Sequence, residues 1–213
     1  ALMALQTLGF ILGAWIAVRL ALGATPAAQF GLVRVAGIRR AVGWAAAVFG
    51  AFWFVTVILT LIFGQPDEQA LVTDLKDEDS TATLIAFGLI LCLGAPIAEE
   101  LFFRGFMYTV LAPRVGPIWA AVVVGTLFGL GHAIGAEAIA VLALCAFGIG
   151  LCLLYWRTGS IIPCMALHAL NNAITFGVVK DLAPALFAGV VVASVGLVAV
   201  GATAFSDRAR VPA

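Results

Sequence analysis

Charged residues are scarce in this sequence. Of its 213 residues, 11 are lysine or arginine and 11 are aspartate or glutamate, whereas 64% are hydrophobic. Soluble globular domains carry about a quarter charged residues, so this composition excludes that class. We therefore expect an integral membrane protein whose surroundings are the lipid bilayer, and no nucleic-acid partner.

Several functional signatures are also missing. The four cysteines, Cys92, Cys145, Cys152 and Cys164, have no C-x-x-C spacing, which favours buried apolar residues over disulfides or metal ligands. There is no glycine-rich phosphate loop and no H-E-x-x-H spacing of a zinc protease. The absence of an internal repeat argues against a transporter built from inverted halves.

Long uncharged stretches, by contrast, recur along the chain. A helix needs about 20 apolar residues to cross a bilayer, and only helices and closed barrels satisfy their backbone groups in lipid. The predicted spans are Leu2–Gly23, Ala41–Gly64, Thr81–Ala112, Ile118–Ala136, Ala138–Trp156, Ile161–Val179 and Leu182–Phe205. The predicted fold is an all-α, polytopic transmembrane helical bundle with about seven to eight spans.

The bundle is predicted to be a single integral membrane domain over residues 1–213, with a motif-bearing core at about 82–180. Because the sequence starts with Ala1 and is apolar from the start, a further upstream helix stays open.

The basic residues of the predicted loops are unevenly distributed. Arginines follow the first, third, fifth and seventh spans, at positions 34, 39, 40, 114, 157, 208 and 210. The other loops hold only Lys76 and Lys180. The positive-inside rule therefore assigns the arginine-bearing loops to the cytoplasm. The acidic segment Asp67 to Asp79 then lies outside, and we interpret it as a solvated connector.

A few strongly polar side chains remain within the spans. They are Glu99, Glu100 and Arg104 in the third, His132 in the fourth, and His168, Asn171 and Asn172 in the sixth. Ionisable residues inside a membrane cost about 2.5 to 3.5 kcal/mol each on insertion scales, so they usually face a cavity and have a function.

The spacing of these residues predicts pairs. Glu100 and Arg104 are four apart and can form an ion pair on one helix face, whereas Glu99 is rotated by about 100° and can point elsewhere. Glu99 and His132 each lie 14 residues from the turn between their spans, about 21 Å along a helix, and so at one depth. His168 matches this depth less well.

This set suits the attack of water on an amide inside the membrane. A carboxylate in a low-dielectric site is a plausible general base, and a histidine at the same depth can share its water. His168 and Asn172, four apart on one helix face, offer N–H donors for a developing oxyanion. Pro96 is expected to kink or widen the third span just before the carboxylates.

Three short motifs resemble a known protease family. They are EELFFRG at Glu99 to Gly105, FGLGH at Phe128 to His132 and HALNN at His168 to Asn172, with RTGSIIP at Arg157 to Pro163 nearby. They resemble the CAAX prenyl endopeptidase and bacteriocin-processing (CPBP, ABI) intramembrane proteases. The resemblance covers about Cys92 to Phe176.

The resemblance implies a glutamate-dependent intramembrane endopeptidase that needs no metal or other cofactor. Glu99 and His132 would activate the water, and His168 and Asn172 would hold the oxyanion. Glu100 and Arg104 would form a structural ion pair. The family's active site opens toward the cytoplasm, and its substrates are membrane-associated proteins or peptides.

Other interpretations stay open at this point. The two histidines and the glutamates could bind zinc from three helices. A proton- or cation-coupled transporter or sensor could use the same buried residues, as could a non-catalytic immunity or scaffold protein of this fold. The small, alanine- and glycine-rich chain suggests a prokaryotic plasma-membrane protein. The sequence predicts neither whether the substrate is prenylated nor the oligomeric state.

Overall fold

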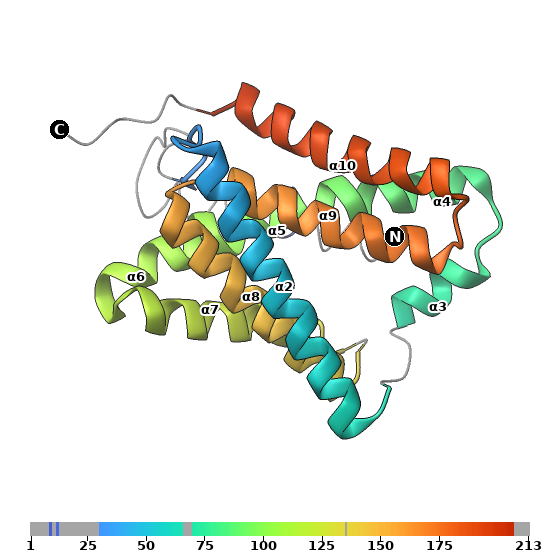
Figure 1. The fold of residues 1–213 in the computed structure, drawn as a ribbon, viewed down its shortest axis with the longest axis horizontal. Coiled ribbons are helices and arrows are strands. Elements are labelled where there is room, and N and C mark those ends of the chain that lie inside the picture. Colours follow the sequence, from blue (N-terminus) through green and yellow to red (C-terminus); the bar gives the residue numbers. More distant parts are fainter. Residues whose placement is uncertain (1–8, 10–11, 13–29, 66–69, 135, 207–213) are drawn as a thin grey trace.

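The computed structural model describes residues 30–65, 70–134 and 136–206, together with residues 9 and 12 (Figure 1). These residues form helices joined by loops, as predicted. The elements are α2 (Ile38–Phe63), α3 (Ala70–Asp77), α4 (Thr81–Leu89), η2 (Ile90–Gly94), α5 (Ala95–Glu100), η3 (Leu101–Tyr108), α6 (Thr109–Val115), α7 (Pro117–Leu130), α8 (Ala138–Thr158), α9 (Ile162–Val179) and α10 (Pro184–Ala204).

Five helices of the described chain are long and apolar enough to cross a membrane. They are α2, the continuous helix Thr81–Val115 that runs from α4 to α6, α8, α9 and α10. The predicted count of seven to eight spans is not confirmed. The first predicted span, Leu2–Gly23, lies outside the described residues except for positions 9 and 12.

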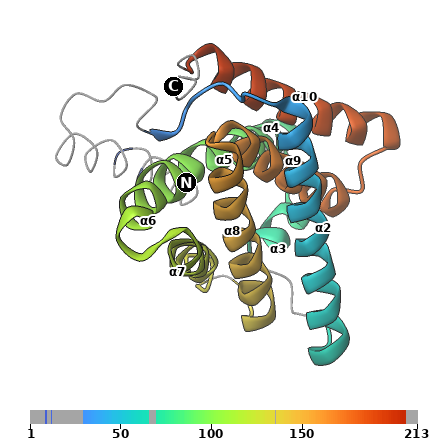
Figure 2. The same ribbon diagram turned by 60° about the vertical axis from the view of Figure 1, so that its left-hand side comes forward.

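Helix α8 lies between α2 and α7 and runs antiparallel to both (Figure 2). Phe52 of α2 packs against Phe147 of α8, with ring centroids 4.8 Å apart and the ring planes tilted by 46°. Glycines bring α7 and α8 into backbone contact, because a Cβ at Gly125 would lie 2.3 Å from the amide nitrogen of Ile149. Small residues at such crossings are typical of helix packing in membranes.

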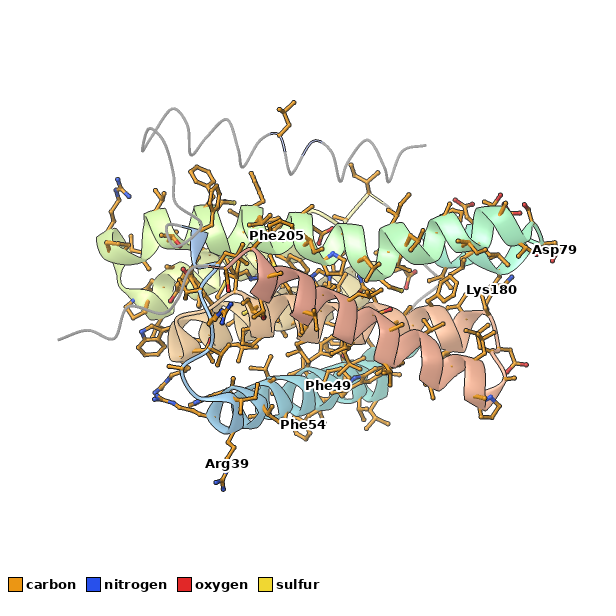
Figure 3. The ribbon with its side chains drawn as sticks, turned by 90° about the horizontal axis from the view of Figure 1, so that it is seen from above. Arg39, Phe49, Phe54, Asp79, Lys180 and Phe205 are labelled. Atoms are coloured by element: carbon orange, nitrogen blue, oxygen red, sulfur yellow. The ribbon has the colours of Figure 1, made fainter. Side chains whose placement is uncertain are left out.

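Among the described residues, the arginines outside the bundle interior gather at one end of it. Arg39 lies in the first turn of α2, Arg114 near the end of α6 and Arg157 near the end of α8. Figure 3 shows Arg39 at the opposite end of the molecule from Asp79 and Lys180. The loop asymmetry found in the sequence therefore corresponds to two chemically different ends of the bundle.

The acidic connector contains structure that the sequence interpretation missed. Residues Ala70–Asp77 form α3, and Leu75 is only 2% exposed. The ammonium of Lys180, at the end of α9, donates to the backbone carbonyls of Leu75, Lys76 and Glu78 at 3.2, 3.3 and 2.9 Å. A cation is favourable at a helix C-terminus, so this lysine holds the connector against the bundle.

The fourth span is shorter than predicted. Helix α7 has 14 residues and ends at Leu130, after which residues 131–134 form a turn. His132 therefore lies just beyond the helix and not inside it. Helices α7 and α8 are antiparallel, and Gly129 packs against Cys145. The turn after α7 therefore lies beside the first turns of α8.

Candidate active site

Two π-helical segments flank the carboxylates of the third span. η2 lies directly before α5 and η3 directly after it, and α5 carries Glu99 and Glu100. In η2 the N–H of Ala95 bonds to the carbonyl of Ile90, five residues back, as in a π-helix. The next residue is Pro96, which has no N–H to donate. The helix is thus widened just before the carboxylates, as Pro96 predicts.

The imidazole of His168 lies between the two glutamates. Its Nδ1 is 3.0 Å from Oε1 of Glu100, and its Nε2 is 4.0 Å from Oε2 of Glu99. The exposed fractions are 4% for His168, 0% for Glu100 and 8% for Glu99. A carboxylate only accepts hydrogen bonds, so Nδ1 is the donor to Glu100 and Nε2 is the nitrogen nearer Glu99. The sequence suggested that Glu99 points elsewhere than Glu100. In the structure both carboxylates face the His168 ring.

Arg104 fixes Glu100 from the other side. Its Nη1 donates to Oε1 of Glu100 at 2.9 Å, and its Nη2 donates to the carbonyl of Gly148 at 2.8 Å. The guanidinium carbon lies 4.7 Å from the ring centroid of Phe128. Both Arg104 and Glu100 are fully buried. The spacing in the sequence predicts this pair, but not that Glu100 also holds His168.

His132 reaches the same neighbourhood from the turn after α7. Its Nδ1 is 3.0 Å from the carbonyl of Phe128, and its ring centroid is 5.2 Å from that of Phe128. The His168 ring lies 5.6 Å from the same phenyl ring. Within the described chain no hydrogen bond or ion pair joins His132 to Glu99. The two histidines therefore share Phe128 as a neighbour, and the contact to Glu99 is made by His168.

The side-chain amide of Asn172 is hydrogen-bonded to a backbone carbonyl. Its Nδ2 donates to the carbonyl of Leu91, in η2, at 2.9 Å. Asn172 lies one helical turn beyond His168 on α9, so two contacts tie α9 to the widened helix. One is at His168 and Glu100, and the other is at Asn172 and Leu91.

Sequence reasoning missed three participants in this site. Phe128 and Phe147 enclose His168, with ring centroids at 5.6 and 5.9 Å. Gly148 supplies the carbonyl for Arg104, and a Cβ at this position would lie 2.6 Å from the carbonyl oxygen of Gly125. Phe128 belongs to the FGLGH motif but is not among the predicted site residues, and no local pattern marks Gly148.

Two buried carboxylate oxygens in this site have no hydrogen-bond partner among the described residues, Oε2 of Glu99 and Oε2 of Glu100. Buried polar atoms are usually satisfied by protein groups or by water. In the described part of the chain, no group of three or more His, Cys, Asp and Glu residues is arranged to hold a metal ion. The site is thus a small polar cluster surrounded by aromatic rings.

A comparison with protein families gives a match over the segment that contains these residues. A model described as type II CAAX prenyl endopeptidase Rce1-like matches residues 81–174. This segment is similar to an Rce1-like domain. It extends from the start of α4 into α9 and contains the three motifs whose resemblance was noted in the sequence, which confirms that prediction.

The Rce1-like match and the apolar helices together support a membrane protease. No curated protein and no solved structure matches the chain.

Proposed function

We propose that this chain is an intramembrane endopeptidase that hydrolyses a peptide bond in a membrane-associated protein or peptide. The observation that carries the proposal is the buried imidazole of His168 between the carboxylates of Glu99 and Glu100. Such a cluster is costly inside a membrane and is therefore a candidate for function.

In the proposed mechanism Glu99 is the general base. The 4.0 Å separation between Glu99 Oε2 and His168 Nε2 is too long for a direct hydrogen bond and suits one bridging water. Glu99 takes a proton from this water, and the resulting hydroxide attacks the scissile carbonyl. The C–N bond then breaks as Glu99 returns that proton to the leaving amide nitrogen. The products are a carboxylic acid and an amine.

His168 is proposed to stabilise the oxyanion through Nε2 in its protonated form. Glu100 orients the ring through Nδ1 and stabilises the imidazolium, while Arg104 balances the charge of Glu100. His132 is proposed as the second partner of the hydrolytic water, as the family resemblance implies. Its Nδ1 is engaged with Phe128, which leaves Nε2 for that role. The sequence also predicts Asn172 in the oxyanion hole; because its Nδ2 donates to the Leu91 carbonyl, no role is assigned to it in this mechanism.

Two substrate classes fit this proposal. The description of the matching family favours peptides that end in a prenylated cysteine followed by three residues. The enzyme would release these last three residues. Leader peptides without a lipid are the second class. We further propose a prokaryotic plasma membrane, with the site opening toward the cytoplasm at the arginine-rich end of the bundle.

The test is cleavage of a synthetic farnesylated peptide and its unprenylated counterpart by the purified chain in proteoliposomes. Glu99→Gln should reduce kcat/KM at least about a hundredfold, the lower range for loss of a general base. Asp74→Asn, which removes an exposed carboxylate of α3, is the matched control and should leave the rate unchanged. Cleavage at the wild-type rate by folded Glu99→Gln would exclude this mechanism.

The proposed chemistry is independent of metal. Treatment with EDTA or 1,10-phenanthroline should therefore leave the initial rate unchanged. Inhibition by both chelators, reversed by added zinc, would replace the general-base proposal with a metal-assisted one.

A further inference from the structure

The backbone around Pro96 has an unusual hydrogen-bond pattern. In η2 the hydrogen bonds span five residues, and the bond from Ala95 N–H to the Ile90 carbonyl is the last one that the chain itself can make. The next bond in this register would run from residue 96 to the carbonyl of Leu91. Residue 96 is proline, so this carbonyl has no backbone donor in the π register.

The side chain of Asn172 occupies the place of the missing donor. Its Nδ2 lies 2.9 Å from the Leu91 oxygen, although the two residues are 81 positions apart. This contact is partly buried, so loss of the donor would cost up to the about 1–3 kcal/mol of a fully buried carbonyl. The amide of Asn172 therefore completes the hydrogen-bond pattern that Pro96 interrupts.

This contact lies close to the proposed catalytic residues on both helices. Glu99 and Glu100 follow Pro96 by three and four residues within α5, which is a single short helix. His168 precedes Asn172 by four residues on the same face of α9. The hydrogen bond between Asn172 and the Leu91 carbonyl therefore also positions the carboxylates of Glu99 and Glu100 relative to the His168 imidazole.

We propose that Asn172 is a positioning residue that acts through the Leu91 carbonyl, and that Pro96 makes it necessary. Asn172 does not touch the substrate in this account. Its amide supplies the hydrogen bond that proline cannot make, which sets the register of the widened helix and hence the separation of Glu99 and His168. This role rests on the proposed function for its effect on catalysis, but the hydrogen bond itself does not.

The experiment is a double-mutant cycle with Asn172→Ala, Pro96→Ala and the combination of both. Asn172→Ala should lower kcat about a hundredfold, since a displacement of about 1 Å can cost that much, with KM little changed. Pro96→Ala restores an N–H for the Leu91 carbonyl. The double variant should therefore recover at least tenfold of kcat over Asn172→Ala, measured per folded protein with the farnesylated peptide.

An oxyanion donor would behave differently. If Asn172 contacted the reacting carbonyl, a backbone N–H at position 96 could not replace it, and the double variant would be as slow as Asn172→Ala. That result would overturn the inference while leaving Glu99-dependent cleavage, and so the proposed function, intact. Cleavage by Glu99→Gln at the wild-type rate would instead refute the proposed function alone.

The cycle has a second readout that does not need activity. The destabilisation caused by Asn172→Ala should be at least halved in the Pro96→Ala background, measured as the shift of the unfolding midpoint in mixed detergent micelles. Equal shifts in both backgrounds would show that residues 96 and 172 do not interact and would overturn the inference. This readout also decides the matter if Pro96→Ala is itself inactive.

Discussion

The buried pair of Glu100 and Arg104 allows a quantitative prediction. Replacing Arg104 by methionine keeps much of the side-chain volume but removes a partner from three groups: the Glu100 carboxylate, which keeps only His168, the Gly148 carbonyl and one face of the Phe128 ring. Breaking a buried ion pair on one side costs about 3–5 kcal/mol. Of this, the unpaired Gly148 carbonyl accounts for about 1–3 kcal/mol. We expect Arg104→Met to lower the free energy of unfolding by that total.

The double variant Glu100→Gln/Arg104→Met tests the reason. It removes the buried charge that Arg104→Met leaves uncompensated, so it should be more stable than Arg104→Met by about 2 kcal/mol or more. The assay is reversible unfolding in mixed micelles with increasing SDS, followed by circular dichroism. Arg114→Met, at the exposed end of the same continuous helix, is the control and should change stability by less than about 0.5 kcal/mol.

Two results would refute this reasoning. One is an Arg104→Met variant as stable as Arg114→Met, which would mean that the guanidinium contributes nothing net. The other is additive destabilisation in the double variant, which would mean that Glu100 is not held by Arg104.

Three further predictions concern contacts elsewhere in the bundle. Gly125→Ala should destabilise the bundle by about 1–3 kcal/mol by pushing α7 from α8, whereas Gly189→Ala, in open space on α10, should not, as unfolding midpoints would show. Lys180→Met should speed amide hydrogen exchange in α3, because three carbonyls lose their donor. Unchanged exchange would show that Lys180 does not hold α3 against the bundle. Ser160→Ala removes the hydrogen bond to the Val33 carbonyl and should lower the free energy of unfolding by about 1 kcal/mol in the same detergent titration.

The sequence was informative where local spacing decides a contact. The four-residue spacing of Glu100 and Arg104 predicts their ion pair, and Pro96 predicts a widened helix, since both depend on one helix alone. Hydropathy predicts the long helices within a few residues, because the bilayer imposes their length. The three motifs also carry a family resemblance that agrees with the match over residues 81–174.

Contacts between helices were not predictable in the same way. The depth argument paired Glu99 with His132, but the π-helical turns change both the advance and the rotation per residue, and the Glu99 carboxylate lies next to His168. The length of α7 was overestimated because the apolar residues that follow Gly131 are indistinguishable from a span by hydropathy. Nothing near Lys180 in the sequence indicates that it meets the carbonyls of α3.

The length of α7 has a consequence for the surrounding lipid. At 1.5 Å per residue its 14 residues extend about 21 Å, against about 30 Å for an ordinary hydrocarbon core. Its neighbour α8, with 21 residues, has no such deficit. We therefore expect a hydrophobic mismatch beside α7, where thinning of the bilayer costs a fraction of a kcal/mol per Å. Because acyl-chain length sets the thickness of a bilayer, it should also influence how this protein sorts among membranes of different thickness.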